Sequence, residues 1–239
     1  MNLTPITRAS EFDSSDEEFE EEHHLPLQVS WLDLTMLNYQ QSLGICALPD
    51  FQILQLLLAF NPYPKVFHKG HFCLQGCKFK DVRRNLQKDL EDLKSYNIQD
   101  VFVFCTKGEM VKYRVPSLLE SYQQEGFTVH HHPLPDGSVP DIVSCWKILE
   151  ELRICLENSK TTLIQCYGGL GRSCLIAACL LLQLADTMLP EAAINLLREL
   201  RGTRAIQTVK QYNYLHDFRD NLATYLETKE DSPCRSVSR

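Results

Sequence analysis

Apolar positions divide this chain into segments whose spacing predicts alternating strands and helices. Short apolar runs between polar or turn residues predict buried strands, and apolar positions three or four residues apart predict helices that bury one face. Strands are expected over residues 29–37, 43–48, 100–105, 127–131 and 162–164. Helices are expected over residues 81–96, 115–125, 142–157, 174–184, 190–201 and 210–226. This order predicts a single α/β domain with a central, mostly parallel sheet flanked by helices.

The two ends of the chain differ from this body. Residues 11–22 hold eight acidic residues and no basic one, which predicts a disordered acidic tail over residues 1–26. The polar residues 228–239 predict a second disordered tail, so the domain is expected to span residues 27–227. Since the formal net charge of the whole chain is −7, the body without its acidic segment is close to neutral.

Composition excludes several classes of function. No cluster of Lys and Arg predicts a nucleic-acid surface. No apolar segment reaches the ~18 to 20 residues that a membrane span needs. The N-terminus lacks an apolar signal core, and the 10 cysteines lack the spacing of a small disulfide-bonded domain. We therefore expect reduced thiols in the cytoplasm and nucleus, with a perinuclear concentration, and a monomer.

One segment, residues 161–183 with the sequence TTLIQCYGGLGRSCLIAACLLLQ, combines a strand, a glycine-rich turn and a buried helix. Such a unit directs backbone N–H groups and the positive end of the helix at one point, which is an anion site. Cys166 opens the loop, Arg172 closes it, and Ser173 follows directly. The residues expected to bind phosphate are Tyr167, Gly168, Gly169, Leu170, Gly171 and Arg172.

Each residue type in this loop suits phosphoryl transfer. A thiolate at Cys166 is a nucleophile, and a helix N-terminus and a guanidinium stabilise it. Arg172 offers a planar fork of donors that matches two phosphate oxygens. Ser173 can donate a hydrogen bond to the sulfur when the thiolate leaves. A buried cysteine in an ordinary strand–helix turn is the alternative, but it explains neither the arginine nor the glycines.

The segment C-Y-G-G-L-G-R-S fits C-x5-R-[S/T] and resembles the phosphate loop of the protein tyrosine and dual-specificity phosphatases. With A-I-Q-T-x-x-Q-Y-N-Y-L-H at residues 205–216 and E-F-D-S-S-D-E-E at residues 11–18, the chain resembles the cyclin-dependent kinase-associated phosphatase family. The resemblance implies a dual-specificity phosphatase fold and a phosphocysteine intermediate, without metal or cofactor. It also implies a partner and substrate, a cyclin-dependent kinase phosphorylated on a threonine of its activation segment, and a restraint on the cell cycle.

Two further site residues follow from the resemblance. Leu134-Pro135-Asp136 resembles the W-P-D loop of tyrosine phosphatases, with Leu in place of Trp, and makes Asp136 the expected general acid. Asp141 is the rival, although it stands where it would cap the next helix. The Q-T-x-x-Q-Y stretch implies that Gln207 positions the water that hydrolyses the intermediate.

Two features depart from the family. The residue before the nucleophile is Gln165, where the family has His. Glutamine carries no positive charge, so we expect weaker stabilisation of the thiolate and reduced but measurable activity. Residues 50–75 resemble an insertion between a strand and a helix, where added length costs little entropy.

Two groups of histidines are weighed as metal ligands. In the insertion and just after it, the spacing of His68, His71, Cys73 and Cys77 matches no common zinc pattern. The consecutive residues 130–132 are all His, and on a strand their side chains point to alternate faces, so polar packing is expected rather than convergence on one ion. No metal is expected in the catalytic site.

Two other functions remain as alternatives. A weakly active or inactive kinase-binding module would explain Gln165 and the insertion, but it needs neither a nucleophile nor an acid. A sulfur transferase of the rhodanese type also uses a cysteine-headed anion loop, but it leaves Asp136 and Gln207 without a role.

Overall fold

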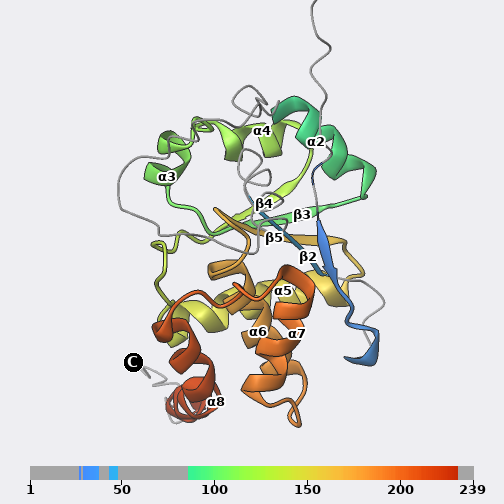
Figure 1. Cartoon of the computed structure of the whole chain (residues 1–239). Helices are drawn as coiled ribbons and strands as arrows, with labels where there is room; N and C mark the ends of the chain where they lie inside the picture. The colour runs from blue at the N-terminus through green and yellow to red at the C-terminus, as the bar shows by residue number, and fades with distance from the viewer. Residues whose placement is uncertain (1–26, 28, 38–42, 48–85, 231–239) are drawn as a thin grey trace, which may run out of the picture.

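The computed structural model describes residues 27, 29–37, 43–47 and 86–230, shown in colour in Figure 1. The predicted insertion at residues 50–75 lies outside these residues, as do His68, His71, Cys73 and Cys77. The acidic tail predicted up to residue 26 and the chain from residue 231 onward lie outside them too. In the described part of the chain, no helix is both long and apolar enough to cross a membrane.

A five-stranded sheet forms the centre of the described domain, with the strand order β1-β2-β5-β3-β4. The strands are β1 (Ser30–Leu32), β2 (Leu43–Ala47), β3 (Asp100–Val103), β4 (Thr128–His131) and β5 (Thr162–Cys166). Only β1 among them runs antiparallel to its neighbour, and the other pairs are parallel. The mostly parallel sheet predicted from the sequence is therefore confirmed.

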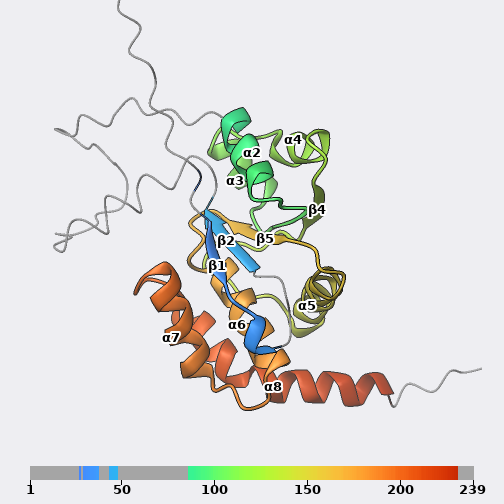
Figure 2. The same ribbon diagram turned by 90° about the vertical axis from the view of Figure 1, so that its right-hand side faces the viewer.

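Helices cover both faces of the sheet, as Figures 1 and 2 show. One layer contains α2 (Leu86–Ser95), α3 (Lys107–Lys112) and α4 (Leu118–Gln124). The other contains α5 (Ile142–Glu157), α6 (Arg172–Leu184), α7 (Pro190–Arg201) and α8 (Val209–Glu230). Each layer closes a separate hydrophobic cluster against the sheet.

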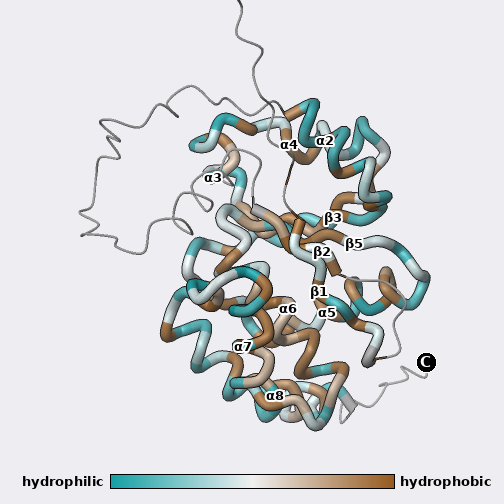
Figure 3. Tube along the Cα trace, turned by 45° about the vertical axis from the view of Figure 1, so that its right-hand side comes forward, coloured by the Kyte–Doolittle hydropathy of each residue, from teal (hydrophilic) through white to brown (hydrophobic). Residues whose placement is uncertain are grey.

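Alternation along the strands supplies both clusters. Val101, Val103 and Leu163 belong to the cluster under α2, α3 and α4, while Phe102 and Ile164 belong to the cluster on the side of α6. Figure 3 shows the resulting concentration of apolar segments along the sheet. Helix α6 is buried along nearly its whole length, from Arg172 to Leu182, so the loop before it is anchored in the core.

Most predicted elements are present, and α5 and α7 have the predicted bounds. The single strand expected over residues 29–37 is wrong, because β1 ends at Leu32 and Thr35–Leu37 form the 3-10 helix η1. The carboxylate of Asp33 accepts the Thr35 N–H at 2.9 Å, which turns the chain. Helix α8 continues to Glu230, beyond the predicted boundary at residue 228.

The start predicted for the helix over residues 115–125 is also wrong. It begins at Leu118, after a turn in which Leu118 N–H donates to Val115 O, so Pro116 lies before the helix. Helix α3 is absent from the sequence-based predictions. The sequence does contain a signal for the start of this helix, a capping box, in which the Thr106 hydroxyl accepts from the Glu109 N–H and the Glu109 carboxylate accepts from the Thr106 N–H.

Arg219 of α8 ties this last helix to the end of α6. Its guanidinium donates to Leu182 O at 3.2 and 3.0 Å and to Ala185 O at 2.7 Å. These carbonyls belong to the C-terminal turn of α6, where the helix itself provides no donors. A cation there also complements the helix dipole.

We expect Arg219→Met to lower the free energy of unfolding by about 1 to 3 kcal/mol, because it leaves these carbonyls without their charged donor. Denaturant unfolding measures the loss. Arg204→Met is the matched control, since Arg204 is exposed, and it should change stability little. Equal losses in both variants would contradict the role given to Arg219.

Candidate active site

The loop between β5 and α6 lies at the carboxyl end of the central strand. Cys166 is the last residue of β5 and Arg172 the first of α6, and their exposed fractions are 2% and 1%. Strands β2 and β3 flank β5, with Ala47 beside Cys166 and Val103 beside Gln165. Open α/β sheets bind ligands at this edge.

Gly169 holds the loop in its curled form. Its N–H donates to Cys166 Sγ at 3.2 Å, and its φ of +62° is accessible at little cost only to glycine. A Cβ at this position would lie 2.7 Å from the carbonyl carbon and oxygen of Cys46. Arg201 donates from Nε to Gly169 O at 3.1 Å and from Nη1 to Ser30 Oγ at 2.9 Å, so α7 and β1 also hold the loop.

Arg172 is the most constrained side chain of the site. Glu109 binds it through two parallel hydrogen bonds, 2.8 Å to Nη1 and 2.7 Å to Nη2. Nη1 also donates to Leu134 O at 2.8 Å and to Phe104 O at 3.3 Å. Burial alone would lower the pKa of Arg172, but the hydrogen-bonded Glu109 carboxylate outweighs it and raises that pKa. The guanidinium is therefore a fixed positive charge.

Two buried polar atoms of the loop have no hydrogen-bond partner among the described residues. They are Nε of Arg172 and Oγ of Ser173. Buried donors without partners are rare in folded proteins and call for an explanation. An oxyanion held by the loop would accept from Arg172 Nε, and a thiolate or its phosphorylated form is a natural partner for the Ser173 hydroxyl.

Glu109 is the main site residue that the sequence interpretation missed. It lies on α3, which packs from the other side of the sheet edge, and its exposed fraction is 15%. Burial would raise the pKa of Glu109, but hydrogen bonds from Arg172 and the Thr106 backbone together lower it. The carboxylate therefore stays ionised and fixes the orientation of the guanidinium.

The two candidate acids occupy different environments. Asp136 Oδ1 lies 3.3 Å from Arg172 Nη2, and 69% of its side chain is exposed at the mouth of the site. Asp141 caps α5, with Oδ1 accepting from the Ser144 N–H at 2.9 Å and Oδ2 from the Ser144 hydroxyl at 2.6 Å. These bonds lower the pKa of Asp141. Asp136 therefore lies beside Arg172, where the predicted proton donor is required, while Asp141 has a capping role.

Residues 205–216 contact both the phosphate loop and the loop that carries Asp136, which we call the acid loop. Thr208 Oγ1 donates to Gly137 O at 3.1 Å, and Gln211 Nε2 reaches Ser138 O at 3.4 Å. Ile206 donates its N–H to Leu170 O at 3.0 Å while holding a φ of +61°, which is strained for a β-branched residue. These bonds set the Asp136 loop beside the anion site.

Gln207 and Gln211 of this segment have different roles. A Cβ added to Gly171 would lie 2.7 Å from Gln207 Oε1, so the exposed Gln207 side chain reaches the phosphate loop. Gln211 is fully buried and accepts from the Gln207 N–H at 3.0 Å. Gln207 therefore lies at the phosphate loop, and Gln211 holds the Gln207 backbone in place.

Gln165 is fully buried on the face of the sheet opposite to α6. Its Oε1 accepts from the Tyr122 hydroxyl at 2.7 Å, a bond between β5 and α4. Burial at such a position disfavours a charged side chain. Gln165 accepts the hydrogen bond from Tyr122 without carrying a charge. The weaker stabilisation of the Cys166 thiolate that we expect from this glutamine stays a prediction.

Other groups around the loop are held neutral by burial. Burial raises the pKa of Cys105 well above the ordinary range and that of Cys174 to about 12, so neither thiol competes as a nucleophile. Tyr167 stacks on Tyr113 at 4.0 Å between ring centroids, and burial raises its pKa as well. The stacking packs Tyr167 of the phosphate loop against Tyr113, which follows α3.

Comparisons with known proteins show the family of this chain. A family model described as Cyclin-dependent kinase inhibitor 3 (CDKN3) matches residues 2–59 and 64–194. Proteins of that name from Mus musculus and Homo sapiens are 60% and 58% identical, covering 98% and 97% of this chain and 99% and 97% of their own lengths.

A crystal structure of a kinase-associated phosphatase, with its catalytic-site cysteine replaced by serine, is also similar. It is 57% identical, covers 83% of this chain and 97% of its own, and superposes with a TM-score of 0.69. Together these likenesses show a cysteine-dependent protein phosphatase with the predicted fold.

We expect Glu109→Gln to lower kcat/KM for a small aryl phosphate by about 10- to 100-fold, because a displaced guanidinium misplaces the phosphoryl group. The variant should also be less stable at pH 7. Since the pKa of Glu109 is lowered in the fold, this stability difference should persist above the ordinary value of 4.5 and vanish as pH falls through the folded value.

Rate assays and urea unfolding at several pH values test both effects. Glu120→Gln, an exposed change on α4, is the control and should alter neither quantity. A Glu109→Gln enzyme with unchanged kcat/KM would contradict the positioning role.

Proposed function

Because the chain belongs to the Cyclin-dependent kinase inhibitor 3 family, we propose that it is a dual-specificity phosphatase acting on the activation-segment phosphothreonine of a cyclin-dependent kinase. Through that reaction it would restrain the cell cycle. The names of the relatives support the kinase as partner. The observation that carries the chemistry is the buried pair of Cys166 and Arg172 at the two ends of a glycine-rich loop.

In the proposed first step, the Cys166 thiolate attacks phosphorus and the bond to the threonine oxygen breaks. Asp136 gives its proton to that oxygen, and a phosphocysteine forms. Arg172 and the loop amides stabilise the charge on the three phosphoryl oxygens. The ion pair with Glu109 sets the orientation of the guanidinium before substrate binds, so little reorganisation is needed.

In the second step, water attacks the phosphocysteine. Gln207 positions the water, and the Asp136 carboxylate takes its proton. The phosphorus–sulfur bond breaks, the Ser173 hydroxyl stabilises the departing thiolate, and inorganic phosphate leaves. No step of this sequence uses a metal ion or cofactor.

A second function is favoured by one specific observation, the glutamine at position 165. A chain with a weakened thiolate could bind the kinase with little or no turnover. Bound kinase without released phosphate distinguishes this module from an enzyme.

The test measures phosphate release from a cyclin-dependent kinase phosphorylated on its activation-segment threonine. The unaltered chain should turn over, and Cys166→Ser should abolish turnover while retaining kinase binding. Asp136→Asn should slow the reaction by about 100- to 10,000-fold, because the leaving oxygen lacks its proton donor. Asp141→Asn is the matched control and should keep most activity with a small loss of stability.

Equal losses in the two aspartate variants would refute the assignment of Asp136. If the unaltered chain binds the kinase but releases no phosphate, and Gln165→His does not restore release, the binding module is the correct function. If the chain releases phosphate from a small aryl phosphate but not from the kinase, the phosphatase mechanism stands and the proposed kinase substrate is wrong.

A further inference from the structure

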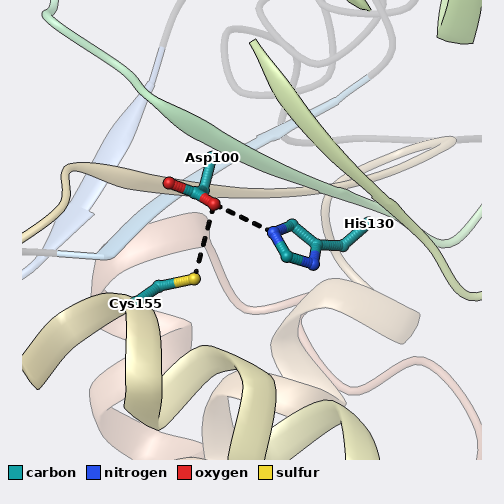
Figure 4. A group of neighbouring side chains, drawn as sticks. All are labelled: Asp100, His130 and Cys155. Atoms are coloured by element: carbon teal, nitrogen blue, oxygen red, sulfur yellow. Dashed lines mark hydrogen bonds and ion pairs between the residues drawn. The ribbon is translucent and has the colours of Figure 1, made fainter. Parts of the chain in front are cut away.

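A cluster of three ligand-type side chains lies away from the phosphate loop, between the sheet and α5. Asp100 is the first residue of β3, His130 lies on the edge strand β4, and Cys155 lies on α5. One donor atom from each lies within 4.8 Å of the other two, and Figure 4 shows the three side chains converging. Because Asp100 begins its strand, the cluster lies at the end of β3 opposite to the catalytic loop.

The three donors are an imidazole, a carboxylate and a sulfur, a combination that suits zinc and similar divalent cations. We propose that Asp100, His130 and Cys155 form a binding site for one zinc-class divalent cation, with a water as fourth ligand. The cation would join the edge of the sheet to α5.

The two donor spacings that involve Asp100 are close to those of a tetrahedral site. Cys155 Sγ lies 3.5 Å from Asp100 Oδ1, and His130 Nε2 lies 2.9 Å from the same oxygen. With metal–ligand bonds of about 2.0 to 2.3 Å, tetrahedral geometry places neighbouring donors about 3.3 to 3.6 Å apart. The sulfur–oxygen spacing already fits, and the nitrogen–oxygen spacing needs to open by a few tenths of an ångström.

The surroundings of His130 resemble the outer shell of metal sites. Glu151 Oε2 lies 3.1 Å from His130 Nδ1, which leaves Nε2 directed at the cluster. Carboxylates in this position fix the tautomer and orientation of metal-binding histidines. Phe102 stacks on the imidazole with 4.1 Å between centroids and 6° between planes, so the ring is held before a cation arrives.

The site is buried but reachable. Exposed fractions are 1% for the Asp100 side chain and 5% for Cys155, while that of the His130 side chain is 19%. Among the described residues, the second carboxylate oxygen of Asp100 is buried without a hydrogen-bond partner, and the Lys160 ammonium forms an ion pair with it at 3.2 Å. Lys160 therefore balances Asp100 in the metal-free chain and opposes a bound cation.

The adjacent histidines do not share the site. His131 Nε2 contacts Cys105 O at 2.9 Å, and His132 Nε2 contacts Glu151 at 2.9 Å. The alternation predicted for residues 130–132 is thus present, and convergence comes instead from residues distant in the sequence. On binding, protons carried by the Cys155 sulfur or His130 Nε2 pass to solvent, and the cation exchanges waters for three protein ligands.

The test uses the full chain carrying Cys166→Ser, which removes the catalytic thiolate as a competing ligand. The reduced, metal-free protein is titrated with Co²⁺ without oxygen, and the near-ultraviolet sulfur-to-cobalt charge-transfer band is recorded. Zn²⁺ affinity is then measured by calorimetry. Cys155→Ser is compared with Cys145→Ser, the same change on the same helix outside the cluster.

We expect one equivalent of Co²⁺ to produce the band in the parent and in Cys145→Ser, and Cys155→Ser to lose it. Glu151→Gln should weaken Zn²⁺ binding by about 10- to 100-fold. Lys160→Gln, a change at a side chain with 41% exposure, should leave the fold intact and tighten binding several-fold.

Titration curves for Cys155→Ser that match the parent would overturn the proposal. Unchanged affinity in both Glu151→Gln and Lys160→Gln would also overturn it, even if Cys155→Ser fails to fold. If the parent shows no charge-transfer band at one equivalent of Co²⁺, the three side chains form only a hydrogen-bonded cluster, and the proposed metal site is refuted.

Discussion

A guanidinium with 1% of its side chain exposed requires a compensating charge, and the structure supplies it from a helix on the other side of the sheet edge. Burying an unpaired charge is strongly unfavourable, and removing one partner of a buried pair typically costs about 3 to 5 kcal/mol. Glu109 is therefore as necessary to the site as Arg172. Because Leu134 O also binds this guanidinium, one side chain joins α3, the acid loop and the start of α6.

The rest of the site is built around that fixed charge. The phosphate loop is held by Arg201 at Gly169 O and by the Ile206 N–H at Leu170 O, while Thr208 holds the acid loop at Gly137 O. Ile206 accepts a strained backbone conformation in this arrangement, which is typical of positions that a functional site over-determines. Cys166, Arg172 and Asp136 thus come from different elements, and the same few contacts hold them in place.

Local signals made part of this structure predictable. Asp141 marks the start of α5, while Pro190 and Gly202 bound α7, and both helices have the expected limits. The phosphate loop was recognisable because its nucleophile, glycines and arginine are contiguous in the sequence. The resemblance to phosphatases added Asp136 and Gln207, which the fold places beside the loop.

The remaining site features depend on contacts between distant residues. Glu109 is 63 residues from Arg172, Tyr122 is 43 from Gln165, and Asp100 is 55 from Cys155. No spacing rule relates such pairs before the strand order is known. Glu109 had a local signal as a capping-box residue, but that signal predicts a helix start and says nothing of an ion pair.

The central claim is that Arg172, oriented by Glu109, is held ready to bind an oxyanion, with Nε as the donor that has no partner among the described residues. Calorimetry with inorganic phosphate on the Cys166→Ser chain, compared with the same chain carrying Arg172→Lys, tests it most directly. We expect one phosphate per chain, and a loss of affinity of about 10- to 100-fold with lysine, which lacks the planar fork. Equal affinity in the two proteins would contradict the account, because phosphate would then bind without the guanidinium.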